Sequence, residues 1–222
     1  MIGFKVLPRA RAVDAATAER FKTLPVANVS DMMSRLYAGG ANLRPMHDGT
    51  PMSGAAVTVR CRPGDNLLVH KALEVAGAGD VIVVDAGGDL TNAIIGEIMV
   101  AYAAKRGLAG IVIHGAIRDA ATLRAGSFPV FAAGVTHRGP YKDGPGEINV
   151  PISLGGMTIE PGDLIIGDAD GVLCVPYDLT EQLYTETAGK HSVEEKMLAD
   201  IAAGTYDASW VDERLKALGC AL

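Results

Sequence analysis

Two short runs of aliphatic residues, each opened by the dipeptide Gly-Asp, constrain the fold of this chain more than any other feature. Asp80 is followed by Val-Ile-Val-Val, and Asp163 is followed by Leu-Ile-Ile. A strand that faces water on one side alternates apolar and polar residues, whereas a strand buried on both faces is a continuous apolar run. The sequence therefore predicts a sheet that is covered on both sides.

Helical patterns alternate with the predicted strands through the first part of the chain. Residues 66–76 have apolar positions at the i, i+3, i+4 spacing of a helix, helical signal resumes up to Arg106, and a short helix is expected over 119–124. Strands are expected at residues 54–61, 81–84, 111–113 and 129–133. Because residues 148–175 carry several short strands without helices between them, we expect an α/β core with a sheet-rich second half.

The N-terminal segment is predicted to be helical before it becomes a loop. Residues 17–37 contain helical pieces around Pro25, and Ser30 is a plausible N-cap for a short helix that continues to Tyr37. Residues 39–51 are predicted to form a loop.

The C-terminal segment is predicted to be helical as well, over about 179–203 and 208–218. The chain contains no repeat, low-complexity tract or linker that would divide it. We therefore expect a single domain over residues 1–222, with a C-terminal helical extension at about 205–222.

Composition limits the partners that this chain can have. Nearly half of the residues are hydrophobic, but only four are Phe and one is Trp, so the core must be aliphatic. A net charge of −6 argues against binding to nucleic acids or anionic membranes. Cys61, Cys174 and Cys220 are odd in number and widely spaced, which argues against a disulfide framework or zinc cage. With no signal peptide or membrane-spanning run, we expect a soluble cytoplasmic protein.

Arg118 and Asp119 end a strand-like segment that begins at Gly110, and Glu97 precedes Arg118 with twenty residues between them. Ligands of open α/β sheets collect at the carboxyl ends of the strands. A cation beside a hard oxygen ligand at this edge suits an anionic, oxygen-rich small molecule held by a metal ion. Individually, however, Asp119 could be an ordinary N-cap, Arg118 a surface ion pair and Glu97 a solvated helix residue.

The glycine-rich stretch from Asp85 to Gly96 allows two interpretations. In the first, a helix begins near Leu90 and Gly96 lies inside it. In the second, the loop extends to Gly96, and the free amides of Ile98 and Met99 point at an anion. The stretch lacks the G-x-G-x-x-G fingerprint of dinucleotide-binding proteins and the Lys-Ser/Thr of a P-loop.

The sequence does not indicate a zinc hydrolase or a serine hydrolase. The five histidines form neither H-x-x-x-H nor H-E-x-x-H, so a zinc hydrolase is not indicated, and His114 in its apolar strand is more typical of a core residue. No G-x-S-x-G is present, which disfavours a serine hydrolase. The loop at residues 137–147 mixes charges with turn formers and could be a lid, a subunit contact or an exposed connection.

Several motifs, taken in order, closely resemble the RraA-like family. They are Gly79-Asp-Val-Ile-Val-Val-Asp85, Gly96-Glu97, Gly110-Ile-Val-Ile-His-Gly-Ala-Ile-Arg-Asp119, Pro140-Tyr-Lys-Asp-Gly-Pro-Gly-Glu-Ile-Asn149 and Pro161-Gly-Asp-Leu-Ile-Ile-Gly-Asp-Ala-Asp-Gly171. The resemblance spans roughly residues 23–204. This family includes the class II 4-hydroxy-4-methyl-2-oxoglutarate/4-carboxy-4-hydroxy-2-oxoadipate aldolases, and its order of motifs is more specific than any single spacing.

The resemblance implies an α/β/β sandwich of the swivelling phosphohistidine-domain type, assembled as a homotrimer or homohexamer with sites between subunits. It implies that Asp119 binds Mg²⁺ or Mn²⁺ directly and that Arg118 holds a keto acid. The segment that would bind the pyruvoyl carboxylate and the waters around the metal consists of Gly96, Glu97, Ile98 and Met99. A further carboxylate would come from the C-terminal helix of the neighbouring subunit, and the resemblance favours Glu194 for it over Glu195.

The function implied is metal-dependent cleavage of a 4-hydroxy-2-oxo diacid to pyruvate and a second keto acid, with oxaloacetate decarboxylation as a side activity. The aldolase motif has Asp where this chain has Glu97, which keeps the charge but lengthens the arm. Family members that regulate RNase E supply the alternative, a non-catalytic protein that binds other proteins. The helical tail beyond Gly204, with Tyr206, Trp210 and Leu215, resembles the longer aldolase-type members more than the short regulator.

Overall fold

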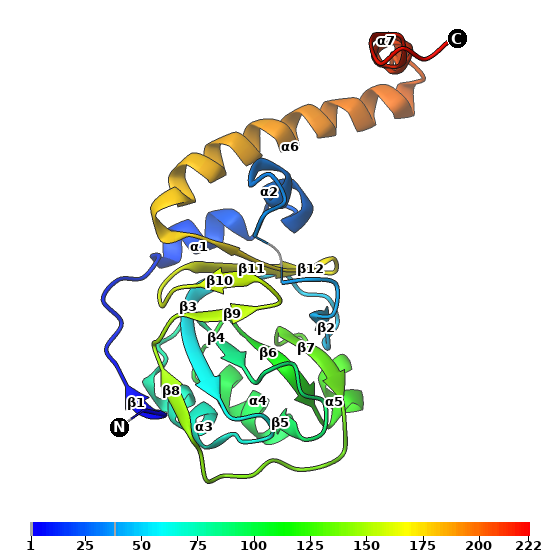
Figure 1. Ribbon diagram of the computed structural model, residues 1–222. Helices are drawn as coiled ribbons and strands as arrows, with labels where there is room; N and C mark the ends of the chain where they lie inside the picture. Colours follow the sequence, from blue (N-terminus) through cyan, green and yellow to red (C-terminus); the bar gives the residue numbers. More distant parts are fainter. Residues whose placement is uncertain (1, 38) are drawn as a thin grey trace.

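A computed structural model describes residues 2–37 and 39–222 of the chain. Its main sheet has the strand order β1-β8-β3-β4-β6-β7-β2, in which the central strands β3, β4, β6 and β7 run parallel (Figure 1). β11 pairs antiparallel with β3, β12 pairs with β11, and β5 pairs parallel with the end of β6. A separate hairpin is formed by β9 and β10.

The strands are β1 (Phe4–Val6), β2 (Arg44–Pro45), β3 (Met52–Cys61), β4 (Asp80–Asp85), β5 (Ala93–Ile95), β6 (Gly110–Ile117), β7 (Val130–Val135), β8 (Gly146–Ile148), β9 (Ile152–Leu154), β10 (Met157–Ile159), β11 (Leu164–Asp168) and β12 (Gly171–Val175). The helices are α1 (Ala15–Phe21), α2 (Val26–Met32), α3 (Leu67–Val75), α4 (Glu97–Lys105), α5 (Ala120–Arg124), α6 (Thr180–Ala203) and α7 (Ser209–Ala217), with a 3-10 turn at Tyr177–Leu179.

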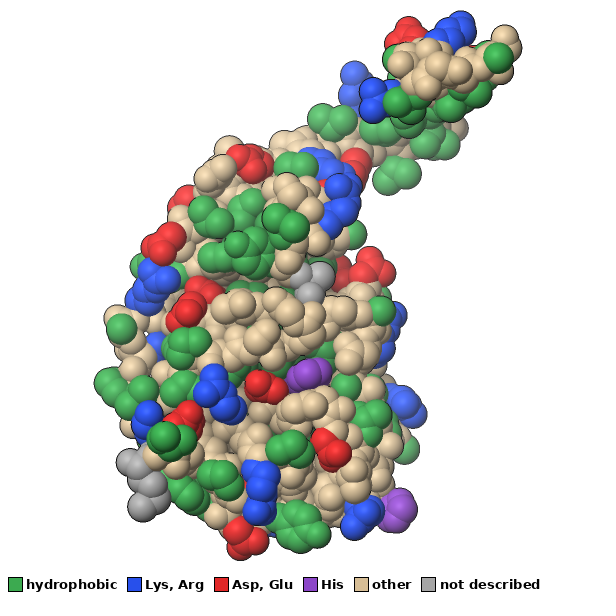
Figure 2. Space-filling model, viewed as in Figure 1, with side chains coloured by type: hydrophobic (Ala, Val, Ile, Leu, Met, Phe, Trp, Pro, Cys, Tyr) green, Lys and Arg blue, Asp and Glu red, His purple; other side chains and the backbone are tan. Residues whose placement is uncertain are grey.

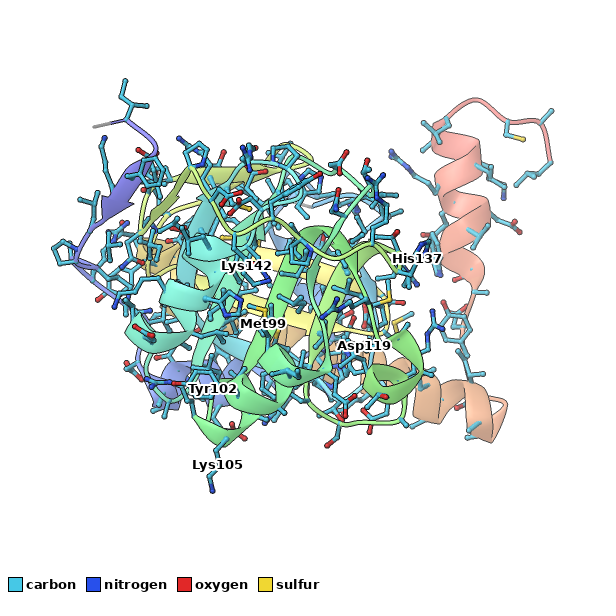
Figure 3. The ribbon with its side chains drawn as sticks, turned by 90° about the horizontal axis from the view of Figure 1, so that it is seen from below. Met99, Tyr102, Lys105, Asp119, His137 and Lys142 are labelled. Atoms are coloured by element: carbon cyan, nitrogen blue, oxygen red, sulfur yellow. The ribbon has the colours of Figure 1, made fainter. Side chains whose placement is uncertain are left out.

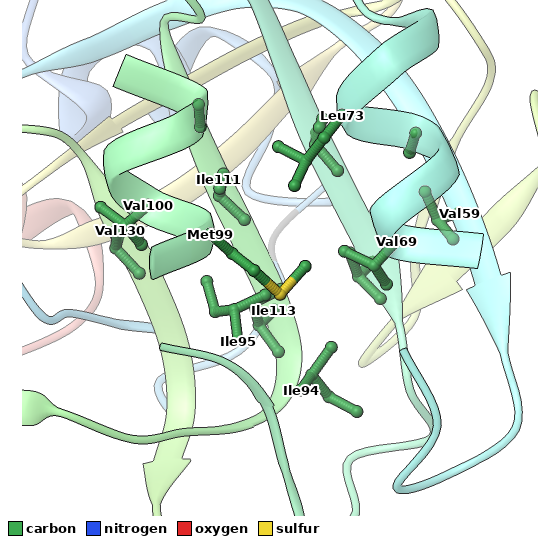
Figure 4. Close-up of a cluster of buried hydrophobic side chains, with 14 of the residues drawn as sticks. Val59, Val69, Leu73, Ile94, Ile95, Met99, Val100, Ile111, Ile113 and Val130 are labelled. Atoms are coloured by element: carbon green, nitrogen blue, oxygen red, sulfur yellow. The ribbon is translucent and has the colours of Figure 1, made fainter. Parts of the chain in front are cut away.

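The aliphatic run of β4 is buried on both faces of the sheet, as its sequence predicts. Ile82 and Val84 point into a cluster with α3 and α4, where Leu73 and Met99 are among the packed side chains (Figure 4). Val81 and Val83 point to the other side of the sheet, into a second cluster. Successive side chains of a strand face opposite sides, so an uninterrupted apolar run needs both layers.

The second cluster lies between the main sheet and a smaller β layer. Side chains of β9, β10 and β12 cover the face of the sheet that is opposite α3 and α4, and Leu154 and Met157 are fully buried there. A third cluster joins β11 and β12 to α1, α2 and the first turns of α6, with Phe21 at its centre. The molecule is therefore layered, with α3 and α4 at one end and α6 at the other (Figure 1).

α6 extends beyond the layered body, and we call its outer part together with α7 the C-terminal arm (residues 193–222). The buried residues of α6 are Thr180, Leu183 and Thr187, all in its first two turns, and α7 has none. Figure 2 shows hydrophobic side chains gathered along the arm, whose exposed members include Leu198 and Trp210. Among the described residues, no helix combines the length and the apolar character that a membrane span requires.

Most of the predicted elements are confirmed, including the helix at 66–76, the strands, the sheet-rich second half and both C-terminal helices. The predicted N-cap at Ser30 is wrong. α2 begins at Val26, directly after Pro25, and Ser30 lies inside it. The helix cannot continue to Tyr37 because Ser34 and Arg35 have positive φ angles, which end it at Met32.

Two further details differ from the sequence predictions. The predicted loop at 39–51 contains β2, a strand of only two residues at the edge of the sheet. The interpretation in which a helix begins near Leu90 is wrong, because residues 93–95 form β5 and α4 begins only at Glu97. The alternative, in which Gly96 precedes the helix, is correct, although it did not include the strand.

Candidate active site

β6 carries Arg118 and Asp119 to the carboxyl edge of the parallel strands. β6 ends at Ile117, and the backbone N–H of Arg118 donates to the carbonyl of Ile95 at 3.0 Å, which fixes the junction against β5. Asp119 has φ 58°, in the left-handed region, a conformation that costs on the order of 1 kcal/mol for a non-glycine residue. The chain therefore turns sharply at the position where the two charged side chains emerge.

The Asp119 side chain does not cap the helix that follows it. Although Asp119 occupies the N-cap position of α5, its carboxylate makes no capping hydrogen bond there. Instead, Oδ2 accepts a hydrogen bond from the backbone N–H of Glu97 at 2.9 Å, at the start of α4. The Nε of Arg118 lies 3.8 Å from the same oxygen. The ordinary N-cap interpretation of Asp119 is thus wrong for the side chain, which joins two elements.

α4 presents its N-terminus to the same edge of the sheet. Gly96 is its N-cap, and the first helical hydrogen bond runs from Val100 N–H to the Gly96 carbonyl at 3.2 Å. Helix geometry leaves the amides of Ile98 and Met99 without intrahelical acceptors, and the aligned peptide dipoles make this end electropositive. The free amides expected from the sequence therefore lie at the helix start, beside Arg118.

A cavity of about 180 Å³ opens next to this helix start. Its walls come from the starts of α3 and α4, from β5, from Arg118 and from the loop after β7. They consist of Asn66, His70, Ile94, Ile95, Gly96, Ile98, Met99, Arg118, Pro140 and Lys142. Figure 3 places Met99 and Lys142 on the same face of the molecule as Asp119. The lining holds two cationic side chains, Arg118 and Lys142, and no carboxylate, so it suits an anion.

His70 adds a neutral polar group to this cavity. Its partial burial lowers the pKa of the imidazole, and the positive charge of Lys142 lowers the pKa further. Because both causes disfavour the imidazolium, His70 is neutral at pH 7 and can both donate and accept a hydrogen bond. The positive charge of the cavity therefore belongs to Arg118 and Lys142.

Asn66 connects three walls of the cavity. Its Nδ2 donates to the carbonyl of Ile94 at 2.8 Å and lies 3.4 Å from the Met99 sulfur, which sets the orientation of the amide. Within the described part of the chain, the buried Oδ1 of Asn66 has no hydrogen-bond partner. A buried acceptor of this kind is costly unless a donor reaches it.

Arg118 also borders a second cavity, of about 300 Å³, on its other side. This cavity is lined by Asp119, Val135, Thr136 and His137 in addition to Arg118. Asp119 belongs to this second cavity and not to the first. Arg118 is therefore common to the cationic cavity and to the cavity that the Asp119 carboxylate lines.

Neither of the predicted carboxylates, Glu97 and Glu194, lines the cationic cavity. Glu97 is next to Asp119 through its backbone, but its side chain is exposed and lines neither cavity. Glu194 lies on α6, at the opposite end of the molecule from α4 (Figure 1). Within one chain, the fold does not bring Glu194 to Arg118 and Asp119.

Glu194 is held in a charged cluster at the base of the C-terminal arm. Its carboxylate forms an ion pair with Lys190 and accepts a hydrogen bond from Asn28 at 2.7 Å, and Lys190 also lies 3.1 Å from Asp31. The hydrogen bond from Lys190 lowers the pKa of Glu194, and that from Asn28 lowers it further. Glu195, by comparison, is largely exposed, and its carboxylate lies 3.6 Å from Nε2 of His191.

A divalent metal ion is compatible with these residues. Among the described residues, no group of three or more His, Cys, Asp or Glu could hold a metal. Mg²⁺ does not need such a cage, because it keeps several waters and takes one or two carboxylates together with oxygens of the substrate. Asp119 is 40% exposed, and its Oδ1 makes no hydrogen bond to the described chain. A single accessible hard oxygen beside an anion site fits Mg²⁺ or Mn²⁺ better than zinc.

Sequence reasoning missed Asn66, His70 and Lys142 as members of the site. The charges and turn formers of the loop that contains Lys142 single it out in the sequence. They do not show which residues face Lys142 across the cavity. Asn66 and His70 are one turn apart on α3, which could place them on one face. They lie beside Lys142 because the loop after β7 is hydrogen-bonded to the residues at the start of α3, where Asn66 N–H donates to the Tyr141 carbonyl at 3.0 Å.

These features define a mixed α/β protein with a small cationic cavity at the carboxyl edge of its parallel strands. The chain belongs to the RraA-like family, described as Aldolase/RraA, whose family model matches residues 26–174. Its structure has the RraA-like α/β fold, as expected from the sequence motifs.

Two relatives carry the provisional name 4-hydroxy-4-methyl-2-oxoglutarate aldolase. A protein of Halalkalibacterium halodurans is 43% identical over 176 residues, which cover 79% of this chain and 84% of the relative. A protein of Thermus thermophilus is 42% identical over 164 residues, which cover 74% of this chain and 94% of the relative. Among solved structures, the RNA-processing inhibitor RraA from Thermus superposes with a TM-score of 0.63 at 34% identity, covering 68% of this chain and 92% of that one.

Proposed function

We propose that this protein is a metal-dependent aldolase that cleaves a 4-hydroxy-2-oxo diacid to pyruvate and a second keto acid. The observation that carries the proposal is the cavity lined by Arg118 and Lys142 and by no carboxylate. Two cations on its walls suit a ligand with two carboxylates, which is the substrate type in the names of the aldolase relatives. Oxaloacetate, another short keto diacid, would be decarboxylated as a side activity.

In this proposal, the chain binds the keto-acid end of the substrate at the start of α4. The amides of Ile98 and Met99, together with the helix dipole, would bind the carboxylate beside the carbonyl. Arg118 would hold the neighbouring oxygens with its planar fork of donors. Lys142 would bind the distal carboxylate, and His70 or Asn66 would reach the hydroxyl group between them.

Asp119, together with oxygens of the substrate and water, would hold Mg²⁺ or Mn²⁺. When bound, the ion would supply positive charge that stabilises the keto-acid oxygen as the bond between C3 and C4 breaks. Arg118 adds the positive charge of a guanidinium group, which stays protonated in proteins. The same charge favours loss of the proton from the C4 hydroxyl, which must leave as that carbon becomes a carbonyl.

The proton from the C4 hydroxyl needs a base, and the C3 carbon needs a proton once its bond to C4 has broken, so a group that accepts the proton and then returns it balances the reaction. The cavity contains no carboxylate that could do this. Glu97, beside Asp119, and the partner subunit's Glu194 are the proposed acceptors. The hydrogen bond from Lys190 lowers the pKa of Glu194, which keeps the carboxylate ionised near neutral pH but also makes it a weaker base. Glu97 is longer by one methylene than the Asp in the aldolase motif, which would shift its carboxylate relative to Asp119.

The need for a second subunit at the site calls for an oligomer, and the family resemblance makes a homotrimer or homohexamer the proposed form. The C-terminal arm supports this part of the proposal. It exposes Val193, Met197, Leu198 and Ile201 on α6 and Trp210 on α7. Apolar side chains gathered on a helix that leaves the body of its own chain are typical of a subunit contact.

A turnover assay tests the proposed function. Pyruvate release from 4-hydroxy-4-methyl-2-oxoglutarate and from oxaloacetate would be measured with Mg²⁺, with EDTA, and after Mn²⁺ is added back. The proposal expects activity that EDTA abolishes and that either ion restores. Activity that is unaffected by EDTA, or no cleavage of any 4-hydroxy-2-oxo acid, would contradict it.

The alternative function is regulation of an RNA-processing enzyme through protein binding. One of the solved structures similar to this chain is the Thermus RraA, whose name describes it as an RNA-processing inhibitor, and this favours the alternative. The acidic net charge of this chain favours it as well. The two functions separate at Asp119. Substitution of Asp119 by Ala should remove lyase activity, whereas binding to RNase E through another surface should survive it.

A further inference from the structure

Asp65 is a fully buried carboxylate that lies between two walls of the cationic cavity. Its Oδ1 accepts a hydrogen bond from the backbone N–H of Leu67 at 3.0 Å, at the start of α3. Its Oδ2 accepts from the backbone N–H groups of Asp143 and Gly144 at 2.8 and 2.9 Å, and from the Arg62 guanidinium at 3.1 Å. One side chain therefore ties the start of a helix to a loop that lies almost eighty residues further along the chain.

The two segments that Asp65 joins carry opposite parts of the cavity wall. Asn66 follows Asp65 directly and lines the cavity from the α3 side, and Lys142 lines it from the loop. The backbone before Lys142 is also fixed to α3, because Tyr141 N–H donates to the Gly64 carbonyl at 2.8 Å and Asn66 N–H donates to the Tyr141 carbonyl at 3.0 Å. Asp65 completes this attachment on the other side of Lys142.

The loop depends on these bonds for its position. Apart from the single bridge between Asp65 and Tyr141, residues 136–145 belong to no helix or strand. A charged acceptor makes hydrogen bonds about twice as strong as a neutral one, and loss of that acceptor leaves buried N–H groups unsatisfied. Without the Asp65 carboxylate, the amides of Asp143 and Gly144 would have to turn toward water, and the loop would move with them.

We infer that Asp65 is a positioning residue for substrate recognition, which acts by fixing where Lys142 stands across the cavity from Arg118. The inference rests on the proposed function, in that Lys142 is taken to bind the distal carboxylate of a diacid. Asp65 itself contacts neither cavity. Its effect on the reaction should therefore appear only for ligands that carry a second carboxylate.

The test compares Asp65→Asn with the wild-type protein on two substrates, a 4-hydroxy-2-oxo diacid and the corresponding monoacid without the distal carboxylate. An amide keeps the shape of the side chain but places an NH₂ group against at least one of the donors. We expect KM for the diacid to rise about tenfold, kcat to change by less than about threefold, and KM for the monoacid to stay unchanged. In a Lys142→Met background, Asp65→Asn should add no further increase, since the two residues act as one unit.

Asp163→Asn is the matched control, because Asp163 is also a buried carboxylate that accepts backbone N–H groups, from Glu160 and Tyr177, both at 2.9 Å. It lies on the β11 side of the fold, away from the cavity. It should lower the melting temperature without separating the two substrates. The inference is overturned if Asp65→Asn also only lowers the melting temperature, or if it raises KM equally for both substrates.

Hydrogen exchange of the loop distinguishes a failure of this inference from a failure of the proposed function. The peptide that contains residues 140–145 should exchange faster in Asp65→Asn than in the wild-type protein, and this measurement needs no turnover. If the wild-type protein cleaves neither substrate, binding of 2-oxoglutarate, with pyruvate as the monoacid, replaces KM. Unchanged exchange in the loop, or equal loss of binding for both acids, would overturn the role of Asp65.

Discussion

Gly96, Arg118 and Asp119 are packed so closely that each limits what the others can be. A Cβ atom on Gly96 would overlap the Asp119 carboxylate oxygen and lie 2.9 Å from the Arg118 Cγ. The φ angle of Gly96 is −152°, an extended conformation open to any residue. The glycine is therefore required for space, so that a helix N-terminus and a strand end can meet without a side chain between them.

Gly96→Ala should consequently remove activity while the fold remains. The added methyl group must displace Asp119 or Arg118, and misplacement by about 1 Å can cost about 100-fold in rate. Gly189→Ala is the control, since nothing lies within 4 Å of its added Cβ and alanine favours the interior of α6. Wild-type kcat/KM in Gly96→Ala would show that this close approach is unimportant for the reaction.

Arg118→Lys tests whether the planar guanidinium is needed. A lysine keeps the charge but cannot offer two parallel donors to a carboxylate. We expect kcat/KM to fall by an amount that corresponds to about 2–4 kcal/mol of transition-state stabilisation. Arg124→Lys, on the exposed side of α5, should have no effect. Unchanged kinetics in Arg118→Lys would remove Arg118 from the site.

The state of His70 can be measured directly. Burial and the charge of Lys142 both lower its pKa, so an NMR titration of the ring protons should give a value below the ordinary 6.5. Lys142→Met removes the positive charge, which is the smaller of the two causes, so the pKa of His70 should rise part of the way back to its ordinary value. Because the folded state disfavours the imidazolium, His70 should cost stability as the pH falls through 6.5. A pKa at or above 6.5 in the wild-type protein would contradict this placement.

At the scale of secondary-structure elements, the sequence predicts what depends on local pattern. β4 and β11 are recognisable as continuous aliphatic runs, because each strand is buried on both faces. α3 is recognisable by apolar residues at helical spacing, because only one face of the helix is buried. β5 was not predicted. It has only three residues, and its apolar pattern alone does not separate a strand from the first turn of a helix. Its pairing with the end of β6 decides the structure.

For the site too, the sequence predicts the residues that local pattern marks and misses those that only tertiary contacts bring together. Arg118 and Asp119 are recognisable because they follow a buried strand directly, where ligands of α/β sheets collect. His70 and Lys142 are far apart in sequence, and they meet where the loop after β7 is attached to the start of α3 by the backbone of Tyr141 and by the buried Asp65. No local pattern carries that information. The bond from Glu97 N–H to Asp119, which holds the carboxylate away from α5, likewise joins residues that are 22 positions apart.

At the scale of the whole molecule, the separation of Glu194 from the cavity leads to the prediction of a shared site. Asp119→Ala and Glu194→Ala subunits should each be inactive alone. After subunit exchange, some interfaces would pair an intact Asp119 with the partner subunit's Glu194, and activity should return in part. Glu195→Ala should stay active, because Glu195 is not held in the cluster with Asn28 and Lys190.

Subunit exchange must be verified in this experiment, for example by the appearance of mixed oligomers of differently tagged chains. Absence of recovery despite exchange would place the whole reaction within one chain. An active monomer at high dilution would lead to the same conclusion.

The most direct measurement for the central claim is the rate of pyruvate release from a 4-hydroxy-2-oxo diacid by Asp119→Asn at saturating Mg²⁺. Asparagine tolerates the left-handed conformation of this position and keeps its shape, so the fold should be retained. The neutral amide is a poor ligand for a hard cation, and we predict that metal-dependent release falls by at least about 100-fold. A correctly folded Asp119→Asn protein with full Mg²⁺-dependent activity would contradict the assignment of this carboxylate to the metal.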